Sequence, residues 1–105
     1  MERRLEPRHF LVLGVEIIDE KSHTKAKART TDVSRSGCYL DTLNPFPAGT
    51  IIKIRMVHDG VAFEARARVV HQAPGMGMGV CFVEPDAANQ AVLDSWLAAA
   101  PLAVS

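Results

Sequence analysis

Hydrophobic and polar residues alternate with a period of two along most of the chain, and this period is typical of β-strands. The pattern is clearest in residues 25–30, which alternate charged with small side chains, as a strand with one solvated face does. A denser apolar run before them is interrupted only by Gly14 and Glu16, which suits a strand in a curved sheet. The strands expected from the sequence are residues 10–18, 25–30, 38–40, 51–57, 61–71 and 79–83.

Turn and cap signals separate these strands from a single helix. Asp59-Gly60 stands between two alternating runs, and this pair is preferred in two-residue type I′ hairpins. Only the C-terminal segment has an apolar stripe at helical spacing, with Asp86 as the candidate N-cap and Pro101 as the stop. Trp96, the only tryptophan, lies on that stripe, and we expect it to plug one opening of the sheet.

About six strands in an order suited to hairpins, followed by one helix, predict an all-β fold. We expect an antiparallel barrel or strongly curled sheet with a C-terminal helix packed on it. A chain of 105 residues has room for one domain with one core. Residues 1–9 are mostly polar and basic and are expected to form a flexible arm, with the barrel and helix in residues 10–100.

The charge balance limits the class of ligand. With 12 basic and 12 acidic side chains the net charge is zero, which argues against binding to DNA or RNA, since long nucleic acids select a broad basic surface. A small anionic ligand needs only a few cations in one place. Three arginines, Arg3, Arg4 and Arg8, fall within six residues at the N-terminus.

Other signals point away from membranes, metals and catalysis. No apolar stretch approaches about 18 residues, so no membrane insertion is expected, and the cytoplasm is the expected location. Cys38 and Cys81 match no metal spacing and are interpreted as small buried hydrophobic residues in a reducing compartment. The four histidines have no ligand spacing, and no nucleophile has a base beside it. We expect neither enzymatic activity nor a cofactor or metal.

Two segments carry the candidate chemistry. The segment Asp32-Val33-Ser34-Arg35-Ser36-Gly37 lies between two expected strands and is rich in turn formers, and Gly37 permits a positive φ. Taken alone it reads as a tight turn whose Asp and Ser cap backbone N–H groups. The arginine cluster, taken alone, reads as a solvated tail. The combination of an arginine cluster with such a turn one hairpin later occurs by chance much less often than either segment alone.

The pair of segments resembles the PilZ family of cyclic di-GMP receptors. The family motifs R-x-x-x-R and [D/N]-x-S-x-x-G are matched here by Arg4 and Arg8 and by Asp32, Ser34 and Gly37. The segment 77–82 is also similar to the last core strand of the family, and the resemblance covers nearly the whole chain. It implies a six-stranded barrel with a C-terminal helix, and cyclic di-GMP as the ligand.

The resemblance assigns a role to each residue of the motifs. Guanidinium groups can fork onto a phosphate or onto the O6/N7 edge of guanine, and the carboxylate of Asp32 can accept from guanine N1–H and N2–H₂, which adenine lacks. Ser34 can add a hydroxyl contact, and Gly37 can let the backbone approach the ligand. Arg35 is expected to add a contact to a phosphate. Arg3 is expected to help hold a second, intercalated ligand molecule, giving two per domain.

The implied function is a bacterial signalling receptor of motility, biofilm or pilus control. Cyclic di-GMP is expected to fold a mobile arm across the barrel, and the new surface is expected to engage an unidentified protein effector in trans. One alternative is a protein-interaction adaptor of the same fold without a ligand, for example in pilus or motility assembly, although the intact motifs count against it. Another is an oligonucleotide-binding barrel, which predicts stacking aromatics on a basic sheet. This chain has six aromatic residues and no net charge.

Overall fold

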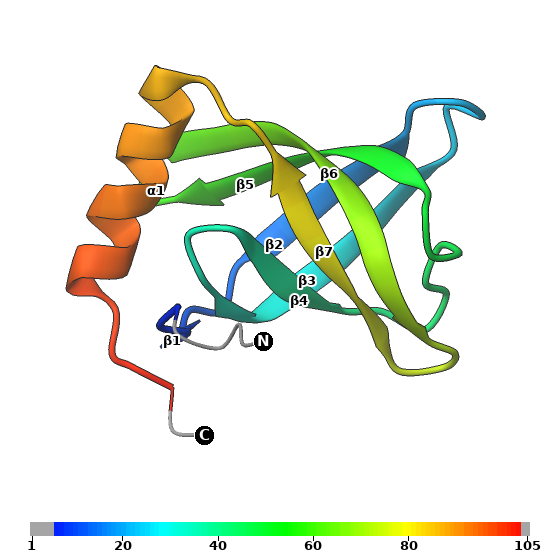
Figure 1. Ribbon diagram of the computed structural model, residues 1–105, viewed down its shortest axis with the longest axis horizontal. Coiled ribbons are helices and arrows are strands. Elements are labelled where there is room, and N and C mark those ends of the chain that lie inside the picture. Colours follow the sequence, from blue (N-terminus) through cyan, green and yellow to red (C-terminus); the bar gives the residue numbers. More distant parts are fainter. Residues whose placement is uncertain (1–5, 104–105) are drawn as a thin grey trace.

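The computed structural model describes residues 6–103, which form seven strands followed by one helix (Figure 1). No helix in this part of the chain combines the length and apolarity needed to cross a bilayer. The elements are β1 (His9–Phe10), β2 (Gly14–Asp19), β3 (Lys25–Val33), β4 (Gly37–Asp41), β5 (Ile51–His58), β6 (Val61–Ala73), β7 (Gly77–Val83) and α1 (Ala87–Ala99).

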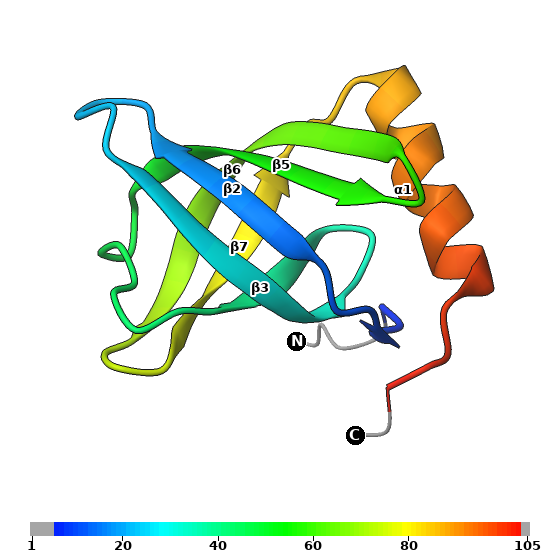
Figure 2. The ribbon, with the colours of Figure 1, turned by 180° about the vertical axis from the view of Figure 1, so that it is seen from behind.

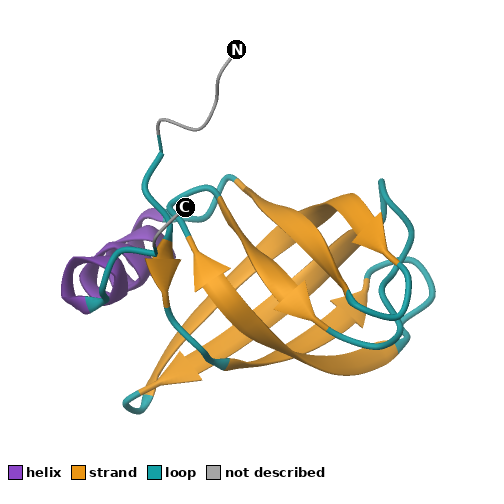
Figure 3. Ribbon diagram, turned by 90° about the horizontal axis from the view of Figure 1, so that it is seen from below, coloured by secondary structure: helices purple, strands orange, loops and turns teal. Residues whose placement is uncertain are grey.

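Strands β2 to β7 close into a barrel, seen from behind in Figure 2 and from below in Figure 3. Neighbouring strands follow the order β3-β2-β5-β6-β7-β4, and β4 returns to pair with β3. All of these pairings are antiparallel. The six-stranded antiparallel barrel with a C-terminal helix is therefore confirmed. The short β1 lies outside the closed ring and pairs with the end of β3.

The strand expected over residues 10–18 is broken into β1 and β2, and Thr30 explains the break. Thr30 is fully buried, and its hydroxyl accepts the N–H of Leu13 (2.8 Å) and donates to the C=O of Leu11 (2.5 Å). A side chain thus replaces part of the strand ladder. The register of β3 against β4 also shifts just after Thr30. As a result the N-terminal segment leaves the barrel wall and returns beside the end of β3.

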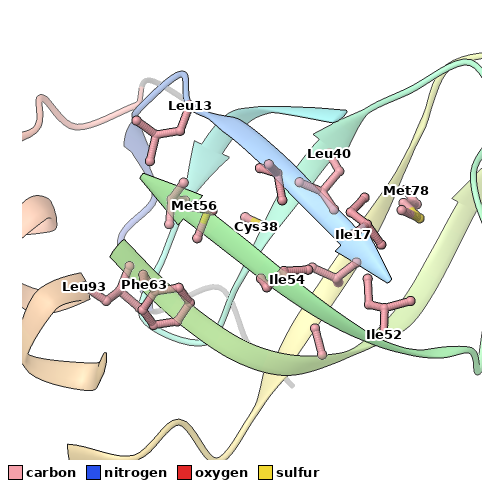
Figure 4. Packing of buried hydrophobic residues seen from close by; sticks show 14 of the residues in the cluster. Leu13, Ile17, Cys38, Leu40, Ile52, Ile54, Met56, Phe63, Met78 and Leu93 are labelled. Atoms are coloured by element: carbon pink, nitrogen blue, oxygen red, sulfur yellow. The ribbon is translucent and has the colours of Figure 1, made fainter. Parts of the chain in front are cut away.

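The core is formed by the inward faces of the strands and one face of the helix (Figure 4). Alternation places Ile52, Ile54 and Met56 inside while Lys53 and Arg55 stay exposed, as the period of two predicts. Removing these apolar side chains from water is the main stabilising contribution to the fold. The buried hydrophobic residues are Leu13, Val15, Ile17, Val33, Cys38, Leu40, Ile52, Ile54, Met56, Phe63, Ala67, Val69, Met78, Val80, Leu93, Trp96 and Leu97.

The local signals for the hairpin and the helix are confirmed. Asp59 and Gly60 have φ of 51° and 77°, the two positive values that a type I′ turn requires. The Asp86 carboxylate caps α1 by accepting from the backbone N–H of Asn89 (2.9 Å), and the helix ends before Pro101.

Helix α1 packs against β6 and stands at one end of the barrel in Figures 1 and 2. The indole ring of Trp96 lies 6.3 Å from the ring of Phe63 and meets the His58 ring edge-on at 5.7 Å. The expectation that Trp96 closes an opening of the sheet agrees with this position.

The expectation of two buried cysteines is right for Cys38 and wrong for Cys81, whose side chain is exposed. Cys81 follows the inward-facing Val80 on β7, so alternation turns its thiol to the outer face. Because Cys81 lies between the apolar residues Val80 and Phe82, the sequence did not show that its side chain faces outward.

Candidate functional site

The candidate site lies where β3 turns into β4. Asp32 belongs to β3 itself, where it is in register with Tyr39 on one side and Phe10 on the other. The backbone N–H of Ser34 donates to the C=O of Gly37 (2.8 Å), so only two residues form the loop. The Ser34 hydroxyl also donates to that carbonyl (3.2 Å), and among the described residues it caps no backbone N–H. Asp32 is thus held by strand pairing rather than by the turn.

Gly37 does not use the positive φ that glycine permits, because positive values occur only at Gly49, Gly60 and Gly75 among the described glycines. Its missing side chain makes room for β7. A Cβ atom at Gly37 would lie 2.1 Å from the backbone oxygen of Val80. Gly37 is also buried. The glycine therefore serves the close approach of two strands, and its expected role in letting a ligand approach the backbone stays a prediction.

Arg8 and Asp32 are in direct contact. The Nε and Nη2 atoms of Arg8 lie 3.2 and 3.1 Å from the same oxygen, Asp32 Oδ1. The short β1 places them together by pairing His9 with Val33. The guanidinium side chain is 61% exposed and the carboxylate 25%, so the pair adds about 1 kcal/mol or less to stability. Within residues 6–103, Asp32 Oδ2 has no hydrogen-bond partner.

The segment before β1 is also held against the turn. The Ser36 hydroxyl donates to the Glu6 carboxylate at 2.5 Å. Residues 6–9 of the expected flexible arm therefore lie against the barrel, and β1 crosses the boundary expected between arm and barrel.

The opposite edge of β1 is hydrogen-bonded to the segment that follows α1. Phe10 N–H donates to the C=O of Pro101 (2.9 Å), and Ala103 N–H donates to the C=O of Arg8 (2.8 Å). Strand β1 and the segment that follows α1 lie below the helix in Figure 1. The backbone of the arm thus joins the candidate site to the C-terminal segment.

Arg35 lies in the turn, but its side chain contacts the helix. Its Nε and Nη2 atoms donate to the two carboxylate oxygens of Asp94 at 2.9 and 3.2 Å. This hydrogen-bonded pairing raises the pKa of Arg35 and lowers that of Asp94. A contact between Arg35 and a phosphate requires Arg35 to leave Asp94, and the phosphate contact stays a prediction.

Arg3 and Arg4 lie outside the described residues. The first arginine of R-x-x-x-R, and the second ligand molecule expected from Arg3, therefore stay predictions. Arg8, Asp32, Ser34 and Gly37 are brought together by the fold.

A cavity of about 680 Å³ lies away from these residues and is lined by Glu20, Lys21, Gly49, Thr50 and Arg66, among others. Two hydrogen bonds from Arg66 to the Glu20 carboxylate, at 2.6 and 3.1 Å, already engage its guanidinium. None of the expected site residues within 6–103 lines this cavity, and its volume alone gives no ligand chemistry.

Sequence reasoning missed the outer-face neighbours of Asp32. Strand register places Phe10, Tyr39, Gly79 and His71 in one row with it across β1, β4, β7 and β6. The alternation of each strand shows which residues face outward. Only strand order and register show which of them are neighbours.

Comparison with known proteins agrees with this architecture. A family model described as the PilZ domain matches residues 2–99. No match was found among curated proteins.

Solved structures with a similar fold include three proteins with low sequence identity. The PilZ domain of CeSA from a cellulose-synthesizing bacterium is 19% identical, with a TM-score of 0.67 over 86% of this chain and 93% of that one. The inhibitor of motility MotI/DgrA from Bacillus subtilis is 18% identical, with a TM-score of 0.73 over 93% of this chain and 51% of that one. The PilZ domain of YcgR from Escherichia coli, solved with c-di-GMP, is 12% identical, with a TM-score of 0.75 over 91% and 89%.

At these identities the structural likeness shows the fold. The family model shows membership, because it spans the barrel and the helix as well as both motif segments. The chain belongs to the PilZ domain family.

Proposed function

We propose that this chain is a cytoplasmic receptor for cyclic di-GMP that signals to a protein partner in trans. The contact between Arg8 and Asp32 carries the proposal, because it joins one residue of each family motif at the surface of the barrel. The structure of the YcgR PilZ domain with c-di-GMP supports the choice of ligand. Binding, rather than catalysis, is the activity proposed.

The chemistry of the two side chains suits a guanine nucleotide. The exposed guanidinium of Arg8 can donate two parallel hydrogen bonds to a phosphate or to the O6/N7 edge of guanine. Asp32 can keep Arg8 on Oδ1 while Oδ2 accepts from guanine N1–H and N2–H₂. Ser34 follows Asp32 two residues later along the chain. Arg4 would add a second arginine contact to the ligand, and Arg3 would help to hold a second ligand molecule.

The signal is proposed to travel through β1. A ligand that engages Arg8 and Asp32 together acts on the strand β1, whose other edge is hydrogen-bonded to Pro101 and Ala103. Because these residues follow α1, a change in the arm changes the surface formed by the arm and the C-terminal segment. A protein effector that binds this surface would respond to the second messenger.

Titration with cyclic di-GMP, followed by calorimetry, tests this function, with cyclic di-AMP and single-stranded DNA as controls. Cyclic di-GMP is expected to bind. Cyclic di-AMP is expected to bind with an affinity lower by about tenfold or more, because adenine has no donors for Asp32. Single-stranded DNA is expected not to bind. Absence of cyclic di-GMP binding at concentrations on the order of tens of micromolar would favour an adaptor without a ligand. Tight DNA binding would favour an oligonucleotide-binding barrel.

A further inference from the structure

One arginine differs from its counterparts on the barrel. Of the six arginines in residues 6–103, five lie within 3.6 Å of a carboxylate oxygen, and Arg68 does not. The five pairs are Arg8–Asp32, Arg29–Asp41, Arg35–Asp94, Arg55–Glu64 and Arg66–Glu20. Arg68 is also exposed. Within residues 6–103, no carboxylate balances its charge.

Strand register places Arg68 in line with the motif turn. Gly37 at the start of β4 pairs with Cys81 on β7, and Cys81 pairs with Arg68 on β6. Two strand spacings separate the backbones of Gly37 and Arg68, roughly 10 Å. The residue between them is a small, exposed cysteine, so no bulky side chain stands in that row.

The adjacent row gives the same arrangement. It runs from Asp32 through Tyr39 and Gly79 to His71, which is exposed on β6. The aromatic ring of Tyr39 extends along β7 toward Gly77, since its Cε2 and Oη are the side-chain atoms nearest to a Cβ built there. It therefore points away from the row that contains Cys81. The two rows thus place Arg68 in line with Gly37 and His71 in line with Asp32.

We propose that Arg68 is a further ligand-binding residue, which contacts the phosphate of cyclic di-GMP that faces away from the arm. This inference rests on the proposed function. The ligand has two phosphates and two guanines, so contacts from one side leave half of its polar groups without protein partners. A ligand lying over β4 and β7 would meet the arm and Asp32 on one side and Arg68 on the other. A guanidinium without a carboxylate partner can bind phosphate without first losing an ion pair.

The substitution Arg68→Gln tests the inference by calorimetry. We expect affinity for cyclic di-GMP to fall about tenfold or more, because a charge-assisted hydrogen bond is lost. The melting temperature should stay near that of the wild type, since no carboxylate in residues 6–103 pairs with Arg68. Arg66→Gln is the matched control, because it removes the same charge from the same strand two residues away. Its affinity should match the wild type.

The outcomes separate this inference from the proposed function. If the wild type does not bind cyclic di-GMP, the proposed function fails. If the wild type binds and Arg68→Gln binds equally well, the inference alone is overturned. An equal loss in Arg66→Gln would also overturn it, because general charge would then explain the effect.

Thiol labelling of Cys81 gives an independent readout. Burial raises the pKa of the Cys38 thiol to about 12, so iodoacetamide should modify only the exposed Cys81. A ligand that spans from the turn to Arg68 lies over Cys81, and saturating cyclic di-GMP should slow its modification several-fold. Unchanged labelling under saturating ligand would place the ligand elsewhere and overturn the inference.

Discussion

Replacing Gly37 with alanine is expected to destabilise the ligand-free barrel by about 3 kcal/mol or more, because the new methyl group cannot be accommodated. A Cβ at this position would lie 2.1 Å from the Val80 backbone oxygen and 3.2 Å from Cα of Cys81. Backbone atoms of a central strand cannot move aside without breaking the pairing of β4 with β7. Thermal unfolding followed by circular dichroism should show a melting temperature lower by roughly 12 °C or more.

Gly14→Ala is the control for this substitution. Gly14 also lies in a strand and has a negative φ, but no atom lies within 4 Å of a Cβ built on it. Its unfolding free energy should change by about 0.5 kcal/mol at most, or rise slightly. Equal melting of the two variants would mean that strand approach is not the reason for glycine at position 37.

Asp32→Ala is expected to weaken cyclic di-GMP binding by roughly 10- to 150-fold, the effect of losing about 1.5–3 kcal/mol in hydrogen bonds to a charged group. The carboxylate is the proposed acceptor for the guanine edge, and it also orients Arg8. Stability should fall by about 1 kcal/mol or less, because the Arg8 side of the pair is 61% exposed to water. Calorimetric titration of the folded variant measures the affinity.

Asp41→Ala is the matched control, because Asp41 is a half-exposed carboxylate on the adjacent β4 and pairs with Arg29 at 3.6 Å. It removes the same charge and should leave affinity unchanged. Asp32→Ala should also lose the preference for cyclic di-GMP over cyclic di-AMP. Wild-type affinity in Asp32→Ala would show that the carboxylate does not read the base.

Much of the fold could be predicted from sequence, because each strand carries its own period and each turn its own residue types. The alternation of Ile52, Ile54 and Met56 and the Asp59-Gly60 pair are local signals of this kind. The break between β1 and β2 could not be predicted, since it depends on the hydroxyl of Thr30, which lies 17 residues beyond Leu13.

The same distinction applies to the site. The motifs drew attention to Arg8 and Asp32, and the fold places them in contact across 24 positions. The pairing of Arg35 with Asp94 joins residues 59 positions apart and has no sequence signature. Arg68 looks like any exposed charge on a strand until strand register shows what lies beside it.

The most direct test of the proposed receptor function is an NMR titration of the ¹⁵N-labelled chain with cyclic di-GMP, observing backbone amides and arginine Nε–H groups. The proposal predicts saturable shift changes that centre on residues 6–10 and 32–37 and include the Nε–H of Arg8. Changes should be small around Lys21, Gly49 and Thr50, which line the separate cavity. No shift changes at saturating ligand, or changes confined to that cavity, would contradict the assignment of the cyclic di-GMP site to the arm and the β3–β4 turn.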